Sequence, residues 1–209
     1  MKMKKLLAMV LCVAMVLGTM TTVVFAEEST AVAKVGNTEY ATIDEAIANW
    51  TANTTLTLLD DVTLNDVITL KSTEHHILNL GTYTLTAASG KNAIEITPEG
   101  AGRAAKACLT INADANNPGG ITSGKSCIYY RKTNGIDDRL MVTINGGVFN
   151  GTISSSSNNG GQPCPYFVFN GGTFNSSINL TKATKQRLHS NSIRCRLQNN
   201  TLHSNNDRF

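Results

Sequence analysis

A ten-residue unit that occurs twice constrains the fold of this chain more than any other feature of its sequence. Residues 141–150 read MVTINGGVFN and residues 166–175 read YFVFNGGTFN, so the second copy starts 25 residues after the first. Looser versions of the unit place Asn112 and Asn79 at 33 and 66 residues before Asn145. A period of this length, made of short strands, predicts supersecondary units that stack one on the next.

Each unit reads as a strand that ends in a sharp turn. In the short runs from Leu56 onward, apolar residues alternate with threonine, which places the apolar side chains on one face of each strand. Asparagine and glycine adopt the left-handed backbone conformation that a corner requires. We expect Phe149 and Phe174 to fill the inward row that follows each corner. Equivalent corners should carry a hydrogen-bonded ladder made of Asn79, Asn112, Asn145 and Asn170.

Composition agrees with a β-rich fold. The 209 residues include 26 threonines, which favour strands, and 22 asparagines, which favour turns. We predict an all-β fold in which residues 55–181 form a right-handed parallel β-helix, a solenoid of stacked coils with variable loops. An antiparallel β-sandwich is the alternative, but its turns would recur about every 8–12 residues, well below the repeat length.

Residues 27–54 read as an N-terminal cap on this solenoid. Two short runs flank Gly36 and Asn37, which predicts a β-hairpin. Thr42 and Glu45 then form a capping box at the start of a short helix. The apolar face of that helix is made of Ile43, Ala46, Ile47 and Trp50.

Residues 1–26 read as a secretion signal rather than as part of the fold. They contain three lysines near the start, an apolar run over residues 6–17, and small residues before a cleavage site after Ala26. The mature protein is therefore expected to be secreted or held at the cell surface. No later segment is long and apolar enough to cross a bilayer, so we expect no membrane span after cleavage.

Charge separates the body of the chain from its C-terminal end. Residues 27–181 hold 9 basic and 14 acidic residues, a net charge of −5, whereas residues 182–209 hold 6 basic residues and one aspartate, a net charge of +5. An acidic body does not suit phosphate binding, so nucleic acid is not an expected partner. Residues 182–209 read as a basic disordered tail. The tail either contacts anionic cell-wall polymer or, as we favour, is a coil left incomplete in a fragment of a longer protein.

With these motifs, the chain resembles the secreted right-handed β-helix proteins that share the pectate lyase fold. The capped helix in residues 40–47 is similar to the helix that covers the N-terminal end of the solenoid in that family, and residues 55–64 resemble a first coil. The Asn-Gly-Gly-x-Phe-Asn units resemble repeats in large surface proteins of Gram-positive bacteria. The resemblance covers residues 32–181. It implies a fold that hosts lyases, hydrolases, esterases, adhesins and passive stalks alike.

Asp137 and Asp138, with Arg131 nearby, are the nearest approach to a catalytic set. Galacturonan hydrolases of this fold add a Gly-His-Gly unit to their aspartates, but this sequence has no histidine between His76 and His189. Adjacent carboxylates on a strand also point to opposite faces and do not flank one bond. We therefore interpret the aspartate pair as part of a solvated loop and expect no catalytic residue there.

The most ligand-like run is Tyr129, Tyr130, Arg131 and Lys132. Aromatic faces stack on sugar rings, and basic side chains pair with uronates. Glycan contact is therefore the binding hypothesis for this run. The alternative is that one tyrosine packs inward while the other decorates the surface.

Metal binding has a weaker basis in the sequence. Asp60, Asp61 and Asp66 are possible oxygen ligands for Ca²⁺, but their spacing does not match a calcium loop. A turn in which Asp60 and Asp61 bond local backbone amides is the preferred interpretation. The cysteines show no Cys-x-x-Cys spacing, which argues against zinc. We expect no cofactor.

Two functions remain open at this stage. The first is a non-catalytic extracellular β-solenoid module of a bacterial surface or secreted protein, structural or adhesin-like, with weak glycan contact. The alternative is a carbohydrate-active enzyme, a polysaccharide lyase or glycoside hydrolase of the pectate-lyase-like group. The enzyme would require the basic and acidic residues between Arg131 and Arg139 to meet in one groove.

Overall fold

The computed structural model describes residues 30–97, 99, 106–131, 140–155, 166–179, 186–188 and 193–195. Apart from Thr30, these residues belong to one compact unit, Ala31–Phe209. Within them the secondary structure is almost entirely β-strand, and the single helix is α2 (Ile43–Ala48). The predicted all-β class is therefore confirmed.

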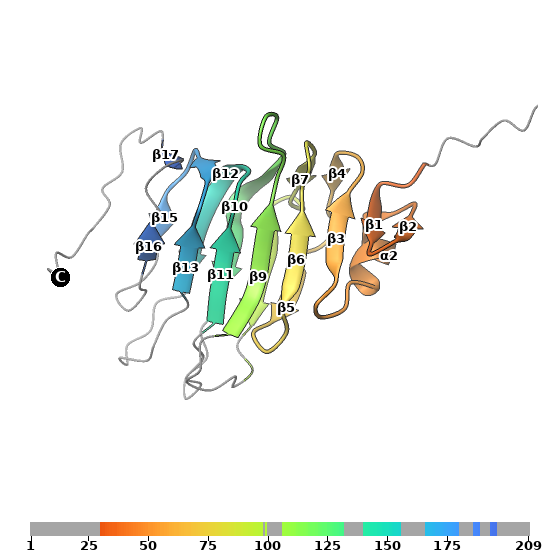
Figure 1. Ribbon diagram of the computed structural model, residues 1–209, viewed down its shortest axis with the longest axis horizontal. Helices are drawn as coiled ribbons and strands as arrows, with labels where there is room; N and C mark the ends of the chain where they lie inside the picture. The colour runs from red at the N-terminus through yellow and green to blue at the C-terminus, as the bar shows by residue number, and fades with distance from the viewer. Residues whose placement is uncertain are drawn as a thin grey trace, which may run out of the picture. The chain divides into compact units, whose positions relative to one another are not determined.

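The chain enters this unit through the predicted hairpin. Strands β1 (Ala33–Val35) and β2 (Thr38–Tyr40) pair antiparallel around Gly36, whose φ of +58° suits glycine. On its other side β1 pairs antiparallel with β3 (Thr55–Leu58). The hairpin therefore adds two strands to the N-terminal edge of a sheet (Figure 1).

Helix α2 follows the hairpin and begins as the capping box predicts. The Thr42 hydroxyl accepts a hydrogen bond of 3.3 Å from the Glu45 backbone N–H. The helix buries Ile43 and Ala46, as expected from its apolar face. Trp50 is only 6% exposed, and its indole N–H donates to the Thr54 carbonyl at 3.1 Å. The tryptophan is therefore a core residue with a satisfied polar atom.

One sheet collects a strand from each repeat in turn. After β3 it contains β6 (His76–Asn79), β9 (Lys106–Asn112), β11 (Leu140–Ile144), β13 (Tyr166–Phe169) and β16 (Gln186–Leu188). Every neighbouring pair from β3 to β16 is parallel, and the arrows of β3, β6, β9, β11 and β13 lie side by side in Figure 1.

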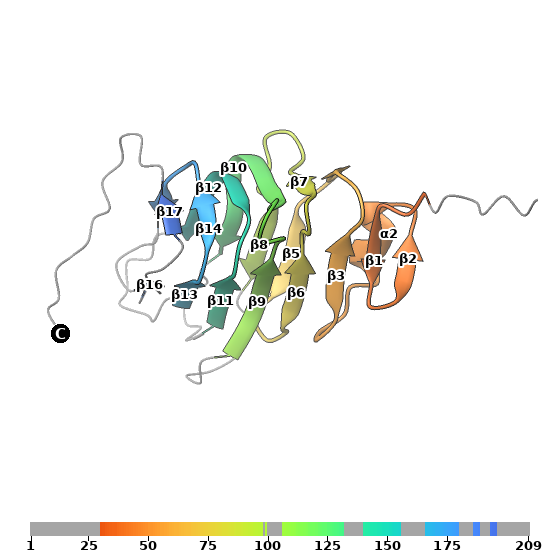
Figure 2. The same ribbon diagram turned by 45° about the horizontal axis from the view of Figure 1, so that its top comes forward.

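A second sheet collects the strands that lie between them in sequence. Its main path runs β4 (Val62–Thr63), β7 (Thr84–Thr86), β10 (Gly120–Tyr130), β12 (Val148–Ser155), β14 (Gly172–Phe174) and β17 (Ile193–Cys195). Beside it lie β5 (Ile68–Lys71), β8 (Ile94–Thr97) and β15 (Ile178–Asn179). Figure 2 brings β12, β14 and β17 into view.

All the pairings of this second sheet are parallel as well. The chain alternates between the two sheets and returns to each one in the same direction. Among the described strands, antiparallel pairing is confined to β1 and its two neighbours. These pairings contradict the antiparallel β-sandwich.

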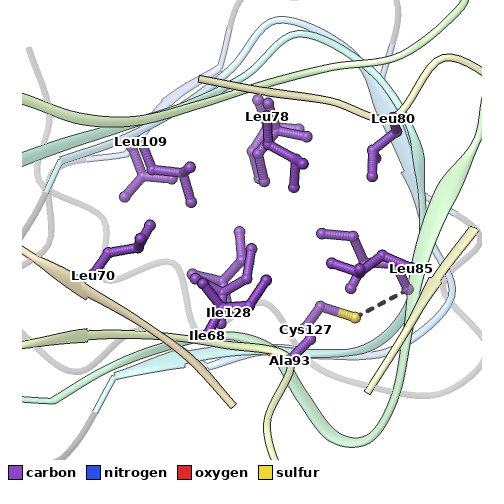
Figure 3. Packing of buried hydrophobic residues seen from close by; sticks show 14 of the residues in the cluster. Ile68, Leu70, Leu78, Leu80, Leu85, Ala93, Leu109, Cys127 and Ile128 are labelled. Atoms are coloured by element: carbon purple, nitrogen blue, oxygen red, sulfur yellow. Dashed lines mark hydrogen bonds between the residues drawn. The ribbon is translucent and has the colours of Figure 1, made fainter. Parts of the chain in front are cut away.

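Apolar side chains from the strands of both sheets fill one core. Figure 3 shows Leu78 and Leu109 from the first sheet pointing toward Ile68, Leu85 and Ile128 from the second. All of these side chains are almost fully buried. The core explains why apolar residues alternate with threonine along strands such as β3 and β5, because every second side chain points inward.

The repeated units place their aromatic residues as predicted. Ile144 and Phe169 are register partners on β11 and β13, and both are buried. The rings of Phe149 and Phe174 stack at a centroid separation of 5.1 Å. Inward rows therefore run from one unit to the next.

The corners differ from the prediction in one respect. The left-handed conformation is adopted by Gly147 and Gly172, the second glycine of each pair, with φ of +113° and +116°. Among the described residues the only non-glycine with positive φ is Asn53. The ladder asparagines thus do not adopt the left-handed conformation, and at Asn145 and Asn170 the second of the two following glycines adopts it instead.

The segment predicted as a disordered tail also differs. Strands β16 and β17 lie within residues 182–209 and pair parallel with β13 and β14. Backbone hydrogen bonding to an open sheet edge does not depend on apolar composition, which is why composition missed these strands. The rest of the tail lies outside the described residues, as does the predicted signal, residues 1–26.

Candidate functional site

A column of asparagine side chains connects three neighbouring strands of the first sheet. Asn145 donates from Nδ2 to Oδ1 of Asn112 at 2.8 Å, and Asn170 donates in the same way to Asn145 at 2.8 Å. Asn79 is the register partner of Asn112, but its Oδ1 accepts from the Gly81 backbone N–H at 3.2 Å. The structure therefore brings all four predicted corner residues into line and links three of them through their side chains.

A second ladder, which the sequence analysis missed, runs along the other sheet. Asn175 donates from Nδ2 to Oδ1 of Asn150 at 2.7 Å, and Asn150 donates to the hydroxyl of Thr122 at 3.3 Å. The sequence pattern could have predicted this second ladder, because Asn150 and Asn175 are the last residues of the two ten-residue units. The first and last asparagine of each unit therefore belong to different ladders.

The outward side of the second sheet carries the aromatic binding candidate. The backbone register places Thr69, Glu95, Tyr129, Ser154 and Asn179 in one row across β5, β8, β10, β12 and β15. We call these five residues the Tyr129 row. Tyr129 is half-buried between neighbours that offer a carboxylate on one side and a hydroxyl on the other.

Arg131 extends this row with an ion pair. Its guanidinium donates to Glu95 at 2.7 Å, and the arginine side chain is 57% exposed while that of Glu95 is 15% exposed. Burial raises the pKa of Glu95, but hydrogen bonds from Arg131 and Asn92 outweigh it and hold the pKa below its ordinary value. The hydrogen bond to Glu95 in turn raises the pKa of Arg131. Both groups are therefore charged at neutral pH.

Tyr130 does not belong to this surface, which corrects the four-residue glycan candidate. Its side chain is 2% exposed and packs in the core. Successive side chains of a strand point to opposite faces, so an outward Tyr129 requires an inward Tyr130. Lys132 lies outside the described residues. Of the four candidates, Tyr129 and Arg131 are thus the two that the structure places on the outer face.

A cluster of hydroxyl groups adjoins the Tyr129 row at Ser154. The Ser126 hydroxyl lies 2.8 Å from both the Thr152 and the Ser154 hydroxyl oxygens. The Ser126 backbone N–H donates to Asn92 Oδ1 at 3.1 Å. This cluster could not be predicted from the sequence, because its members come from two strands and meet only through the register of β10 against β12.

The aspartates considered for Ca²⁺ are engaged by hydrogen-bond donors. Asp60 and Asp61 each accept a backbone N–H at 2.7 Å, from Asp61 and Thr84 respectively. Asp66 accepts hydrogen bonds from the Lys91 ammonium and from the Val67 backbone N–H, which lower the pKa of its carboxyl group. Within the described residues no group of three or more His, Cys, Asp or Glu side chains is arranged to hold a metal ion. The preferred turn interpretation thus fits Asp60, whose bond is local, whereas Asp61 bonds a backbone amide of the neighbouring unit, at the start of β7.

The catalytic alternative depends on residues that are not described. Asp137 and Asp138 lie outside the described residues, so their distance from Arg131 is not defined. The described contact of the Arg131 side chain is with Glu95 on the neighbouring strand β8.

His76 is a buried histidine that packs beside the tryptophan of the cap. Its side chain is 4% exposed, and its ring meets the edge of Trp50 at a centroid distance of 5.0 Å. Nε2 lies 3.3 Å from the Glu74 carboxylate, while the buried Nδ1 has no hydrogen-bond partner. Burial lowers the pKa of His76 despite the nearby carboxylate. The ring therefore behaves as a neutral core group.

Within the part of the chain that the structure describes, no helix has the length and apolar character needed to span a membrane. Comparisons with protein-family models, curated proteins and solved structures found no match to this chain.

Proposed function

We propose that the chain is a non-catalytic extracellular module of a bacterial surface or secreted protein, built as a right-handed parallel β-helix. In this proposal the stacked coils act as a stiff spacer, and the Tyr129 row makes weak contact with glycans. Secretion rests on the signal-like residues 1–26, and the bacterial surface setting rests on the resemblance of the repeated units.

The observation that carries the proposal is the alternation of the chain between two parallel sheets. Each return to a sheet adds a strand in register with the previous one, so that equivalent residues form columns such as the asparagine ladders. A coiled path explains this arrangement most simply. Right-handed crossovers between parallel strands are strongly favoured, which supports the assigned hand.

The Tyr129 row supports glycan contact more than catalysis. A half-buried tyrosine offers a ring face for a sugar, and Ser154 and Asn179 on adjacent strands offer hydrogen-bonding groups. Arg131 already pairs with Glu95, so the row presents balanced charge rather than a bare cation. Neutral sugar hydroxyl groups therefore suit this surface better than a uronate, which must compete with Glu95.

Affinity electrophoresis tests the proposal directly. The purified protein should be retarded in gels that contain a neutral soluble polysaccharide, and Tyr129→Ala should remove the retardation. Tyr83→Ala provides a matched control, because Tyr83 is a partly buried tyrosine outside the row.

Three outcomes would count against the proposal. The first is migration unchanged in every neutral polysaccharide, and the second is retardation that survives Tyr129→Ala. The third is steady release of reducing ends or unsaturated products, which would favour the carbohydrate-active enzyme instead.

A further inference from the structure

Three of the ladder asparagines in the described residues precede a glycine, at Asn145-Gly146, Asn150-Gly151 and Asn170-Gly171. This dipeptide is the one most prone to spontaneous deamidation. Glycine has no Cβ, so its backbone nitrogen can approach the side-chain carbon of the preceding asparagine. All three asparagines are exposed to solvent, so access of water does not distinguish them.

Hydrogen bonding of the side-chain amide does distinguish them. Asn145 is held at both ends, by donation to Asn112 and by acceptance from Asn170, each at 2.8 Å. Asn150 is also held at both ends, by Thr122 and Asn175. Asn170 donates to Asn145, but no described residue donates a hydrogen bond to its Oδ1. The amide must leave its ladder before its carbon can meet the glycine nitrogen, so Asn170 is restrained least.

We infer that Asn170 is a deamidation site and that its deamidation promotes the deamidation of Asn145. In the reaction the Gly171 backbone nitrogen loses its proton to base and bonds to Cγ of Asn170. The bond from Cγ to Nδ2 breaks and ammonia leaves. Water then opens the resulting succinimide to aspartate or isoaspartate, and one negative charge is gained.

The product changes the state of the neighbouring amide. A carboxylate at position 170 has no N–H to donate, so Oδ1 of Asn145 loses its donor and faces a negative oxygen instead. Asn145 is then held through Asn112 alone, as Asn170 was through Asn145. The relay ends at Asn112, because the Cβ of Ala113 hinders attack by the next backbone nitrogen. The second ladder ends in Asn175-Ser176, whose Cβ hinders attack similarly, so Asn150 stays protected.

Peptide mapping by mass spectrometry, with aspartate and isoaspartate resolved, tests this order. The full protein is incubated in mildly alkaline buffer, and the rate at each site is divided by its rate in denaturant. Asn170 should react at least about fivefold faster than Asn145 and Asn150, the factor that one ordinary hydrogen bond contributes. Equal corrected rates at the three sites would overturn the inference.

Two variants test whether the loss of its hydrogen-bond donor raises the deamidation rate of the neighbouring asparagine, which is the relay proposed above. Asn170→Asp should raise the initial rate at Asn145 about fivefold and leave Asn150 unchanged. Asn175→Ser removes the donor to Asn150, so it should raise the rate at Asn150 and leave Asn145 unchanged. Circular dichroism verifies that each variant is folded. If a folded variant accelerates both sites equally or neither, the relay is wrong. If a variant does not fold, the comparison of the three sites in the unmodified chain still tests whether Asn170 reacts first.

Discussion

Gly147 and Gly172 show how single residues set the geometry of the repeated unit. Both have positive φ, and a Cβ at either position would lie 3.3 Å from an inward phenylalanine ring. Each glycine therefore provides a corner and leaves room for the aromatic row at the same time.

Gly172→Ala should destabilise the protein by about 1–3 kcal/mol, because the backbone is strained for any residue with a Cβ. The added Cβ would also lie 3.2 Å from the Gly147 carbonyl oxygen. Gly124→Ala is the matched control, since Gly124 is exposed and its Cβ would meet no atom within 4 Å. Denaturant unfolding measures both; similar losses in the two variants would contradict the role given to Gly172.

His76 makes stability depend on pH. Its folded pKa lies below the ordinary value of 6.5, so the unfolded chain takes up the proton first. The stability that neutral His76 contributes is fully present above the pKa that this residue has in the unfolded chain. It is lost as the pH falls from that value through the lower pKa of the folded state. Of the two titratable neighbours of the ring, Glu74 raises the pKa of His76 and His75 lowers it.

Replacement of His76 by leucine should therefore flatten the melting temperature between about pH 7 and pH 5, where the unmodified chain loses stability. His75→Gln is the control, because His75 is only half-buried and bonds the Thr110 hydroxyl at 3.0 Å. An unchanged slope in the leucine variant would show that other groups control the acid response.

At the scale of elements, strands β13 and β14 depend on a shared aromatic cluster. Phe169 is 1% exposed, and its ring centroid lies 6.0 Å from that of Phe167 and 5.2 Å from that of Phe174. Two strands from different sheets are therefore held to one another by these rings.

Phe169→Ala should lower the free energy of unfolding by about 3–5 kcal/mol, the usual range for a core aromatic residue. Val168→Ala on the same strand should have a much smaller effect, because Val168 is half-exposed on the opposite face. Chemical unfolding followed by circular dichroism gives both values, and comparable losses would place Phe169 outside the core.

Elements with a clear period-two pattern were predictable, and those that depend on register were not. The alternation in residues 141–150 indicated inward Ile144 and Phe149, which the structure confirms. Strand β10 was missed because its middle is rich in serine and glycine, and bulges break its period. Tyr129 could be proposed from its neighbours in sequence, but its pairing with Glu95 and Ser154 depends on strands far away in the chain.

At the scale of the whole molecule, both sheets continue into the C-terminal segment. Strands β16 and β17 occupy the edges that β13 and β14 would otherwise expose. Open edges of parallel sheets pair readily with other chains, so these short strands are expected to protect solubility.

Deletion of residues 182–209 should leave a cooperative thermal transition, because the aromatic cluster and the ladders lie before this segment. The shortened protein should aggregate more readily than the full chain, through the newly exposed β13 and β14. Calorimetry and light scattering distinguish the two effects. Loss of the cooperative transition would mean that the segment is an essential cap.

The parallel order of the two sheets has a mechanical consequence. The hydrogen bonds between neighbouring strands point along the direction in which successive strands are added. Tension applied along that direction loads all the interfaces in series, so the weakest interface opens first, and the hydrogen bonds of one interface are not all loaded together in shear. Below that force the stack should stay stiff. Above it the strands should peel away singly, so that the spacer yields in steps that reverse when the load is released.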